Sequence, residues 1–95
     1  MLNSKQIAFL KAKSHSIVPV VSLGHKGMSD SVINEIDVNL SAHELIKIKI
    51  QNDSKEGRNK ALDLVCQKLN AQPINHIGKI LVIFRANKKT KIDLP

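Results

Sequence analysis

The chain has 95 residues, of which 42% are hydrophobic, so it can build one folded domain but not two separate cores. Fifteen Lys and Arg residues outweigh eight Asp and Glu residues, and the net charge of +7 favours a polyanionic partner such as RNA. One cysteine excludes an internal disulfide, and no apolar run approaches the roughly 20 residues of a membrane span. We therefore expect a cytoplasmic protein with no membrane partner.

The first 23 residues predict a helix followed by a strand. Asn3 and Gln6 have the spacing of a capping box, so a helix should start there and run to about Lys13. Residues 18–23 are rich in valine and predict a strand. Pro19 has no backbone N–H to donate, which places it at the start of that strand or on a sheet edge.

The middle of the chain predicts two more helices and one alternating strand. Ser29 or Asp30 can cap a helix whose apolar residues share one face, namely Val32, Ile33, Ile36 and Leu40. Residues 45–50 alternate strictly, so the isoleucines should face the core while the lysines face outward, at Lys47 and Lys49. Residues 53–56 resemble another capping box before a third helix with apolar positions at Ala61, Leu62, Val65, Cys66 and Leu69.

The end of the domain predicts a hairpin. Residues 74–77 and 80–84 are joined by Gly78 and Lys79, and a glycine at the first loop position suits a type II′ turn. The last strand is apolar on both faces, so helices must cover both faces of the sheet. We expect one compact α/β domain at residues 1–87, in the order α-β-α-β-α-β-β around a mixed four-stranded sheet. Residues 88–95 are expected to form a flexible basic tail.

The turn before the second helix is the strongest candidate for ligand contact. It contains Gly24, His25, Lys26 and Gly27. The N–H groups at a helix start lack partners within the helix and carry the positive end of its dipole. Glycines let a phosphodiester backbone approach closely, and Lys26 adds a cation. The spacing indicates either a phosphate clamp like the GXXG loop of KH domains or a glycine-rich turn with an incidental lysine.

Basic side chains elsewhere could extend such a contact, and the candidates are Lys47, Lys49, Arg58, Arg85, Lys88 and Lys89. They could equally be solvated charges, or lysines that protect a sheet edge from pairing. The two aromatic residues, Phe9 and Phe84, suit burial rather than base stacking. We therefore expect recognition of structured RNA through phosphates, shape and 2′-hydroxyls.

Catalytic and metal-binding patterns are weak in this sequence. The loop lacks the residues of a Walker motif, the histidines lack zinc-site spacing, and Cys66 lies on an apolar helix face. We predict no enzyme, cofactor, metal or small-molecule substrate. Two alternatives stay open: an RNA-modifying enzyme that uses His43 and Glu44, and a protein-interaction adaptor that docks on ribosomal proteins or assembly factors.

Three runs in order, residues 20–29, 43–50 and 76–85, resemble the YhbY/CRM-domain family (chloroplast RNA splicing and ribosome maturation), in its stand-alone bacterial type. The resemblance spans about Leu2 to Arg85. It implies a fold like the C-terminal domain of a bacterial translation initiation factor, with an added N-terminal helix. It also implies an RNA-binding protein that associates with precursor large ribosomal subunits. We expect a monomer, with pairing of an uncovered sheet edge to another copy as the alternative.

The resemblance further implies which residues contact RNA. The family's loop falls on residues 24–27, followed here by Met28 and Ser29, and its basic strand falls on Lys47 and Lys49. Arg85 matches the arginine that follows the last strand. Phe84 stands where many relatives have tyrosine, which puts a hydrogen bond or stacking role in doubt at this position. The expected RNA-binding set is Gly24, His25, Lys26, Gly27, Met28, Ser29, Lys47, Lys49, Arg58, Arg85, Lys88 and Lys89.

Overall fold

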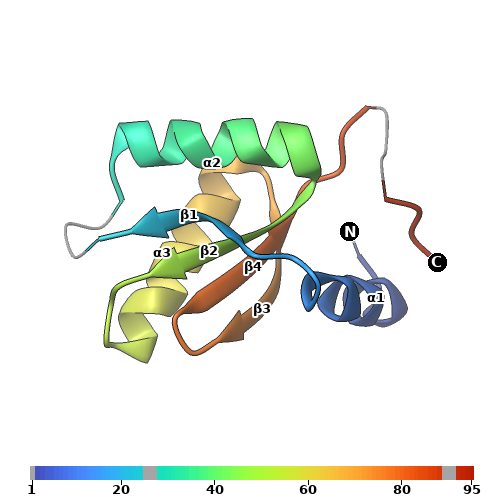
Figure 1. Ribbon diagram of the computed structural model, residues 1–95, viewed down its shortest axis with the longest axis horizontal. Coiled ribbons are helices and arrows are strands. Elements are labelled where there is room, and N and C mark those ends of the chain that lie inside the picture. The colour runs from blue at the N-terminus through green and yellow to red at the C-terminus, as the bar shows by residue number, and fades with distance from the viewer. Residues whose placement is uncertain (1, 25–27, 89–91) are drawn as a thin grey trace.

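A computed structural model describes residues 2–24, 28–88 and 92–95 (Figure 1). It has three helices and one four-stranded sheet within this described part of the chain, in the order that the sequence predicts. The elements are α1 (Ser4–Ser14), β1 (Pro19–Leu23), α2 (Asp30–His43), β2 (Leu45–Ile50), α3 (Lys55–Leu69), β3 (Gln72–Ile77) and β4 (Ile80–Phe84). The α/β fold class is therefore confirmed.

Local capping signals set the starts of the helices. At α1 the Gln6 backbone N–H donates to Asn3 Oδ1 at 2.8 Å, and the Asn3 N–H donates to Gln6 Oε1 at 3.0 Å, which is the predicted capping box. At α2 the Ser29 hydroxyl accepts from the Val32 N–H. Both starts agree with the sequence.

The start of α3 differs from the prediction. Its N-cap is Ser54, whose hydroxyl accepts from the Gly57 N–H at 3.2 Å, so Asp53 does not cap the helix. A capping box needs a side-chain acceptor three residues after the cap. Because Gly57 occupies that position, the expected capping box at residues 53–56 is wrong.

The sheet has the strand order β1-β2-β4-β3, with β1 parallel to β2 and the other two pairs antiparallel. Pro19 is the first residue of the edge strand β1, as its missing N–H requires. Because β1 and β2 are parallel, both carboxyl ends lie at the same end of the sheet. The starts of α2 and α3 follow there, both at the left of Figure 1, with α2 above the strands and α3 below them.

Helices cover both faces of the sheet, as the apolar last strand requires. The main core, between the sheet and the pair α2 and α3, includes Leu23, Ile36, Leu40, Ile46, Ile48, Val65, Leu81 and Ile83. A second cluster under α1 contains Leu10, Leu45, Ile74, Val82, Phe84 and Ile92. Phe84 is 2% exposed, so it packs in the core, as expected for an aromatic residue of this chain.

The hairpin between β3 and β4 turns at Gly78, which has φ +55°, while Lys79 has no positive φ. A positive φ at only the first loop residue is the pattern of a type II′ turn. This agrees with the prediction from the order Gly78-Lys79.

Residues 92–95 pack on the domain, within the segment 88–95 that is expected to form a flexible basic tail. Ile92 is buried in the second cluster, and Leu94 packs against it. The Gln6 amide donates to the Pro95 carbonyl at 3.3 Å, so the end of the chain lies beside α1. Two apolar residues among lysines show no period, yet burying them stabilises this segment on the domain.

Candidate nucleic-acid interface

The candidate interface lies at the carboxyl ends of the parallel strands β1 and β2. The Gln51 N–H donates to the Leu23 carbonyl at 3.0 Å and so joins the two strand ends. α2 starts after one strand and α3 after the other, which brings two helix N-termini to one edge. In open α/β sheets, ligands bind outside the carboxyl ends of the strands. His25, Lys26 and Gly27 lie outside the described residues.

Gly24 is exposed at this edge, and the fold does not require a glycine there. Its φ lies outside the left-handed region, and a Cβ built on it would meet nothing within 4 Å. Neither backbone strain nor crowding within the described residues therefore explains the missing side chain. Close approach by a ligand would explain it.

A cavity of about 600 Å³ lies next to Gly24. Its apolar wall comes from Leu23, Met28, Ile50, Ala61 and Leu64, and its polar rim from Gln51, Asn52, Asp53, Ser54 and Lys60. Of the residues that line this cavity, Gly24 and Met28 belong to the RNA-binding set expected from the sequence, and the others do not. The missed residues could have been found from the parallel pair, because residues after β2 must then lie beside residues after β1.

The turn between β2 and α3 is fixed by Asn52. Its Oδ1 accepts from the Ser54 N–H at 2.9 Å, and its carbonyl accepts from Arg58 Nη1 at 2.7 Å. A Cβ on Gly57 would lie 2.5 Å from Asn52 Nδ2. The glycine therefore leaves room for the Asn52 side chain, which in turn shapes the rim of the cavity.

We expect Gly57→Ala to destabilise the fold by about 1 kcal/mol, although alanine normally stabilises a helix by about that much relative to glycine. The added Cβ displaces Asn52 and weakens its bond to Ser54. In an Asn52→Ala background the same change should stabilise instead, because the obstructing side chain is gone. Urea unfolding of the four variants measures both effects, and equal effects in both backgrounds would contradict this packing.

Lys47 and Lys49 lie on the sheet face opposite α2 and α3, on the same side as α1. Lys49 is exposed and Lys47 is half-buried, in agreement with the outward orientation predicted for β2. None of the eight Asp and Glu residues lies in α1 or in any of the four strands. These elements carry five lysines, namely Lys5, Lys11, Lys13, Lys47 and Lys49. This side of the molecule is therefore largely basic. The carboxylates lie in α2, α3 and the connecting segments, apart from Asp93 in the C-terminal segment beside α1.

Arg58 has a structural role that the sequence did not indicate. Its Nε donates to His76 Nε2 at 3.1 Å, and the other ring nitrogen of His76 lies 2.8 Å from Asn59 Oδ1. Nε2 must be an acceptor, so Nδ1 carries the proton that is donated to Asn59. Arg58, which the sequence predicts to contact RNA, therefore connects the start of α3 to β3.

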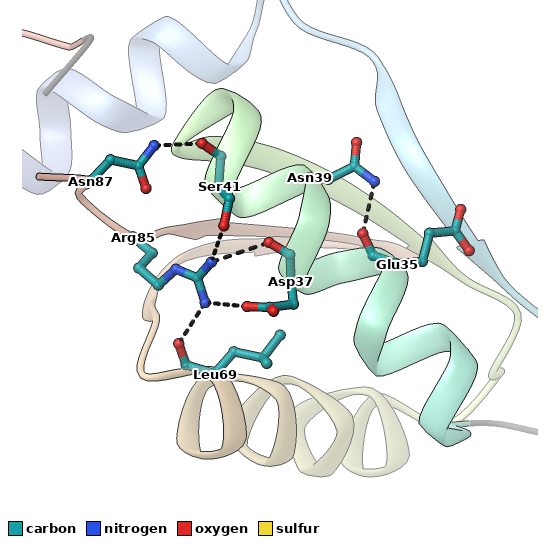
Figure 2. Close-up of polar contacts among 7 residues, drawn as sticks. All are labelled: Glu35, Asp37, Asn39, Ser41, Leu69, Arg85 and Asn87. Carbon is teal, nitrogen blue, oxygen red and sulfur yellow. Dashed lines mark hydrogen bonds and ion pairs between the residues drawn. The ribbon is translucent and has the colours of Figure 1, made fainter. Parts of the chain in front are cut away.

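Arg85 is likewise engaged with the protein (Figure 2). Nη1 lies 2.7 Å from Asp37 Oδ1 and donates to the Leu69 carbonyl at 3.1 Å. Nη2 donates to the Asp37 carbonyl at 3.1 Å and to the Ser41 hydroxyl at 2.9 Å. The side chain is 20% exposed. The expected RNA contact is thus a structural residue in this fold, which joins α2 and the end of α3 to the segment after β4.

The register also separates Arg85 from the loop. Leu45 pairs with Phe84 at one end of β2, whereas Leu23 pairs with Ile50 at the other. Five residue steps along a strand span about 17 Å. Lys88 is exposed near Arg85, and Lys89 lies outside the described residues. The structure therefore does not bring this part of the expected RNA-binding set together with Gly24.

His43 and Glu44 do not form a catalytic pair. Glu44 is fully buried, and its carboxylate accepts from the N–H groups of Asn87, at 2.7 Å, and Ile92, at 3.0 Å. His43 is exposed and lines a separate groove of about 320 Å³ beside β1, which Glu44 does not line. The arrangement gives Glu44 a structural role rather than one in proton transfer.

The other reactive groups do not indicate a catalytic site either. Burial, with a smaller contribution from the charge of Asp63, raises the pKa of Cys66 to about 11, so the thiol stays protonated and unreactive at neutral pH. No group of three possible metal ligands occurs among residues 2–24, 28–88 and 92–95. None of the described helices is both long and apolar enough to cross a membrane.

Comparisons with known proteins agree with this fold. The chain is 37% identical to a Haemophilus influenzae protein named RNA-binding protein, over 99% of this chain and 95% of that one. It is 32% identical to "Probable RNA-binding protein YqeI" of Bacillus subtilis, over 100% of both. The solution structure of SAV1595 from Staphylococcus aureus, described as a candidate RNA-binding protein, matches with a TM-score of 0.88 and 27% identity over 100% of both chains. Residues 2–85 match the CRS1 / YhbY (CRM) domain model, so the chain belongs to this family.

Proposed function

We propose that this domain binds structured RNA at the carboxyl ends of β1 and β2, and that the RNA is ribosomal RNA of precursor large subunits. Gly24 carries the proposal. It is a glycine that neither strain nor packing requires, placed directly after the end of β1, in the connection that leads to α2. A phosphate could approach the backbone there and meet the positive end of the helix dipole. Lys26, two residues after Gly24 in the sequence, would add a cation to this phosphate contact.

The charge distribution supports a second part of the contact. RNA that reaches from Gly24 across the sheet would pass Lys49 and then Lys47, and the lysines of α1 lie on the same side. No carboxylate from α1 or the strands would repel its phosphates. Arg58 and Arg85 are left out of this surface because their guanidinium groups bind the protein. The proposed surface is thus the Gly24 edge together with the face of α1 and β2.

The names of the relatives support the partner class. Two relatives that match over nearly the whole chain are named for RNA binding. The preference for ribosomal RNA rests on the family resemblance. We further propose that the protein acts as a monomer in the cytoplasm. A protein-interaction adaptor is the competing proposal. Association with precursor large subunits that survives nuclease treatment of exposed RNA would favour the adaptor.

We expect Lys26→Glu and Gly24→Val each to weaken binding to a ribosomal RNA fragment by about tenfold at physiological salt, with unchanged stability. Lys26→Glu places a negative charge where a phosphate is proposed to bind, and Gly24→Val obstructs its approach. Titrations at several salt concentrations measure the affinity and its dependence on salt. The log–log slope should become shallower by about 0.7 to 0.9 for each phosphate that the variant no longer neutralises.

Lys68→Glu is the matched control, because it makes the same change of charge in the exposed last turn of α3, away from the proposed surface. It should reduce affinity far less than Lys26→Glu. Equal reductions from the two reversals would indicate attraction by net charge alone. Unchanged affinity for Lys26→Glu would reject the loop as a contact.

A further inference from the structure

We propose that the cavity beside Gly24 holds one unstacked nucleotide of the bound RNA, with its base turned into the cavity. This inference rests on the proposed function, because it assumes that a phosphate binds at Gly24. The cavity is lined by residues from five parts of the fold: the ends of β1 and β2, Met28 in the segment before α2, the turn after β2, and one face of α3. It opens directly next to the glycine.

The size and chemistry of the cavity suit a nucleotide. Its volume of about 600 Å³ falls within the range of about 300 to 1,000 Å³ typical of small-molecule sites. Such sites combine apolar walls with a few polar groups. Met28 and Leu64 offer apolar and polarisable surface to the faces of a base, without the aromatic residues that this chain lacks. The side chain of Leu64 is 39% exposed, so its apolar surface is open to a ligand.

Polar groups for a base edge lie along the rim. Asn52 uses its Oδ1 to accept from Ser54, and among the described hydrogen bonds its amide nitrogen has no protein partner. The side chain of Gln51 is half-buried at the same rim. Amide groups can donate to or accept from the edges of bases. The rim can therefore contact a base edge while the wall contacts its faces.

The charges at the rim favour a base over a second phosphate. Asp53 Oδ1 lies 2.9 Å from Lys79 Nζ, and Glu56 Oε1 lies 3.6 Å from Lys60 Nζ. Asp53 and Lys60 are the charged residues given as lining the cavity, and each is paired with an opposite charge, so the rim offers no excess cation to a phosphate, whereas an uncharged base needs none. We therefore assign the phosphate to the Gly24 backbone and the base to the cavity. The sequence, with its few aromatic residues, predicted recognition through phosphates, shape and 2′-hydroxyls alone. The cavity adds contact with a base to that mode of recognition.

The test compares RNA hairpins that have a one-nucleotide bulge, with each of the four bases, and a hairpin with an abasic bulge. The abasic hairpin keeps the phosphate and the ribose. For the unmodified protein, at least one base should bind about tenfold more tightly than the abasic bulge. Leu64→Ala should abolish most of this difference by removing the apolar wall. Val38→Ala should preserve it, since Val38 is an aliphatic residue of α2, 66% exposed, that does not line the cavity.

The outcomes separate the two proposals. If all hairpins bind equally and Leu64→Ala has no effect, the nucleotide site is rejected while RNA binding at Gly24 stands. If no hairpin binds in a salt-dependent way, the proposed function itself fails. Methyl NMR of Met28 and Leu64 with mononucleotides adds a further outcome. Tight binding of a free mononucleotide, without discrimination between the hairpins, would overturn the RNA assignment and indicate a site for a free nucleotide.

Discussion

Arg85→Ala is expected to lower the free energy of unfolding by about 2–3 kcal/mol. The guanidinium makes hydrogen bonds to the carbonyls of Asp37 and Leu69, to the Ser41 hydroxyl and to the Asp37 carboxylate (Figure 2). The exposed part of the ion pair contributes little, because water screens it. The larger effect comes from partly buried acceptors that are left without a donor. The midpoint of thermal unfolding should fall by roughly 10–20 °C.

Two variants sharpen this test. Arg85→Lys keeps the charge but cannot donate to all four acceptors, so it should recover only part of the stability. Lys88→Ala removes an exposed cation from the same end of the fold and should change stability by less than about 0.5 kcal/mol. RNA binding by folded Arg85→Ala should stay within about twofold of the unmodified protein. Normal stability with a strong reduction of RNA affinity would instead return Arg85 to the RNA-binding surface.

Glu44→Ala is expected to be similarly destabilising, by about 2–4 kcal/mol. The fully buried side chain of Glu44 accepts from the N–H groups of Asn87 and Ile92. Without it, both amides lack this acceptor and Ile92 is held less firmly on the second core cluster. Hydrogen exchange at Asn87 and Ile92 should accelerate more than exchange in β2 or β4.

A shortened chain that ends at Asn87 provides the control. It lacks Ile92 and the packing of the C-terminal segment, so it should itself be less stable. Glu44→Ala should cost clearly less in this background, because part of what the carboxylate binds is already absent. The same cost in both backgrounds would show that Glu44 acts independently of the C-terminal segment. Either result is measured by urea unfolding.

The features that local sequence determined are those that depend on residues a few positions apart. The alternation at residues 45–50 gave β2 and its outward lysines, and the spacing of Asn3 and Gln6 gave the start of α1. Pro19 was placed correctly because its missing N–H is a property of one residue. The α3 start was misplaced by one residue, because the choice between Asp53 and Ser54 depends on how Asn52 holds the turn.

The tertiary structure decided which basic residues are engaged with the protein itself. Arg58 and Arg85 carry the same charge as the exposed lysines. However, Arg58 binds His76, 18 residues away, and Arg85 binds Asp37, 48 residues away. Local patterns carry no signal of such pairs, because the pairs depend on which strand ends meet. The same holds for Glu44 and Ile92, and for the cavity between Met28 and Leu64.

The sequence by itself thus determined the order of elements, the basic character and the place of the Gly24 turn, because each follows from local spacing or from counting charges. Only the tertiary structure put the ends of β1 and β2 together through their parallel pairing. That pairing separates Gly24 from Arg85 and creates the cavity between the two strand ends and α3. The physical reason is that a cavity and a partly buried ion pair are made by residues distant in the chain, whose approach is fixed by packing of the whole core.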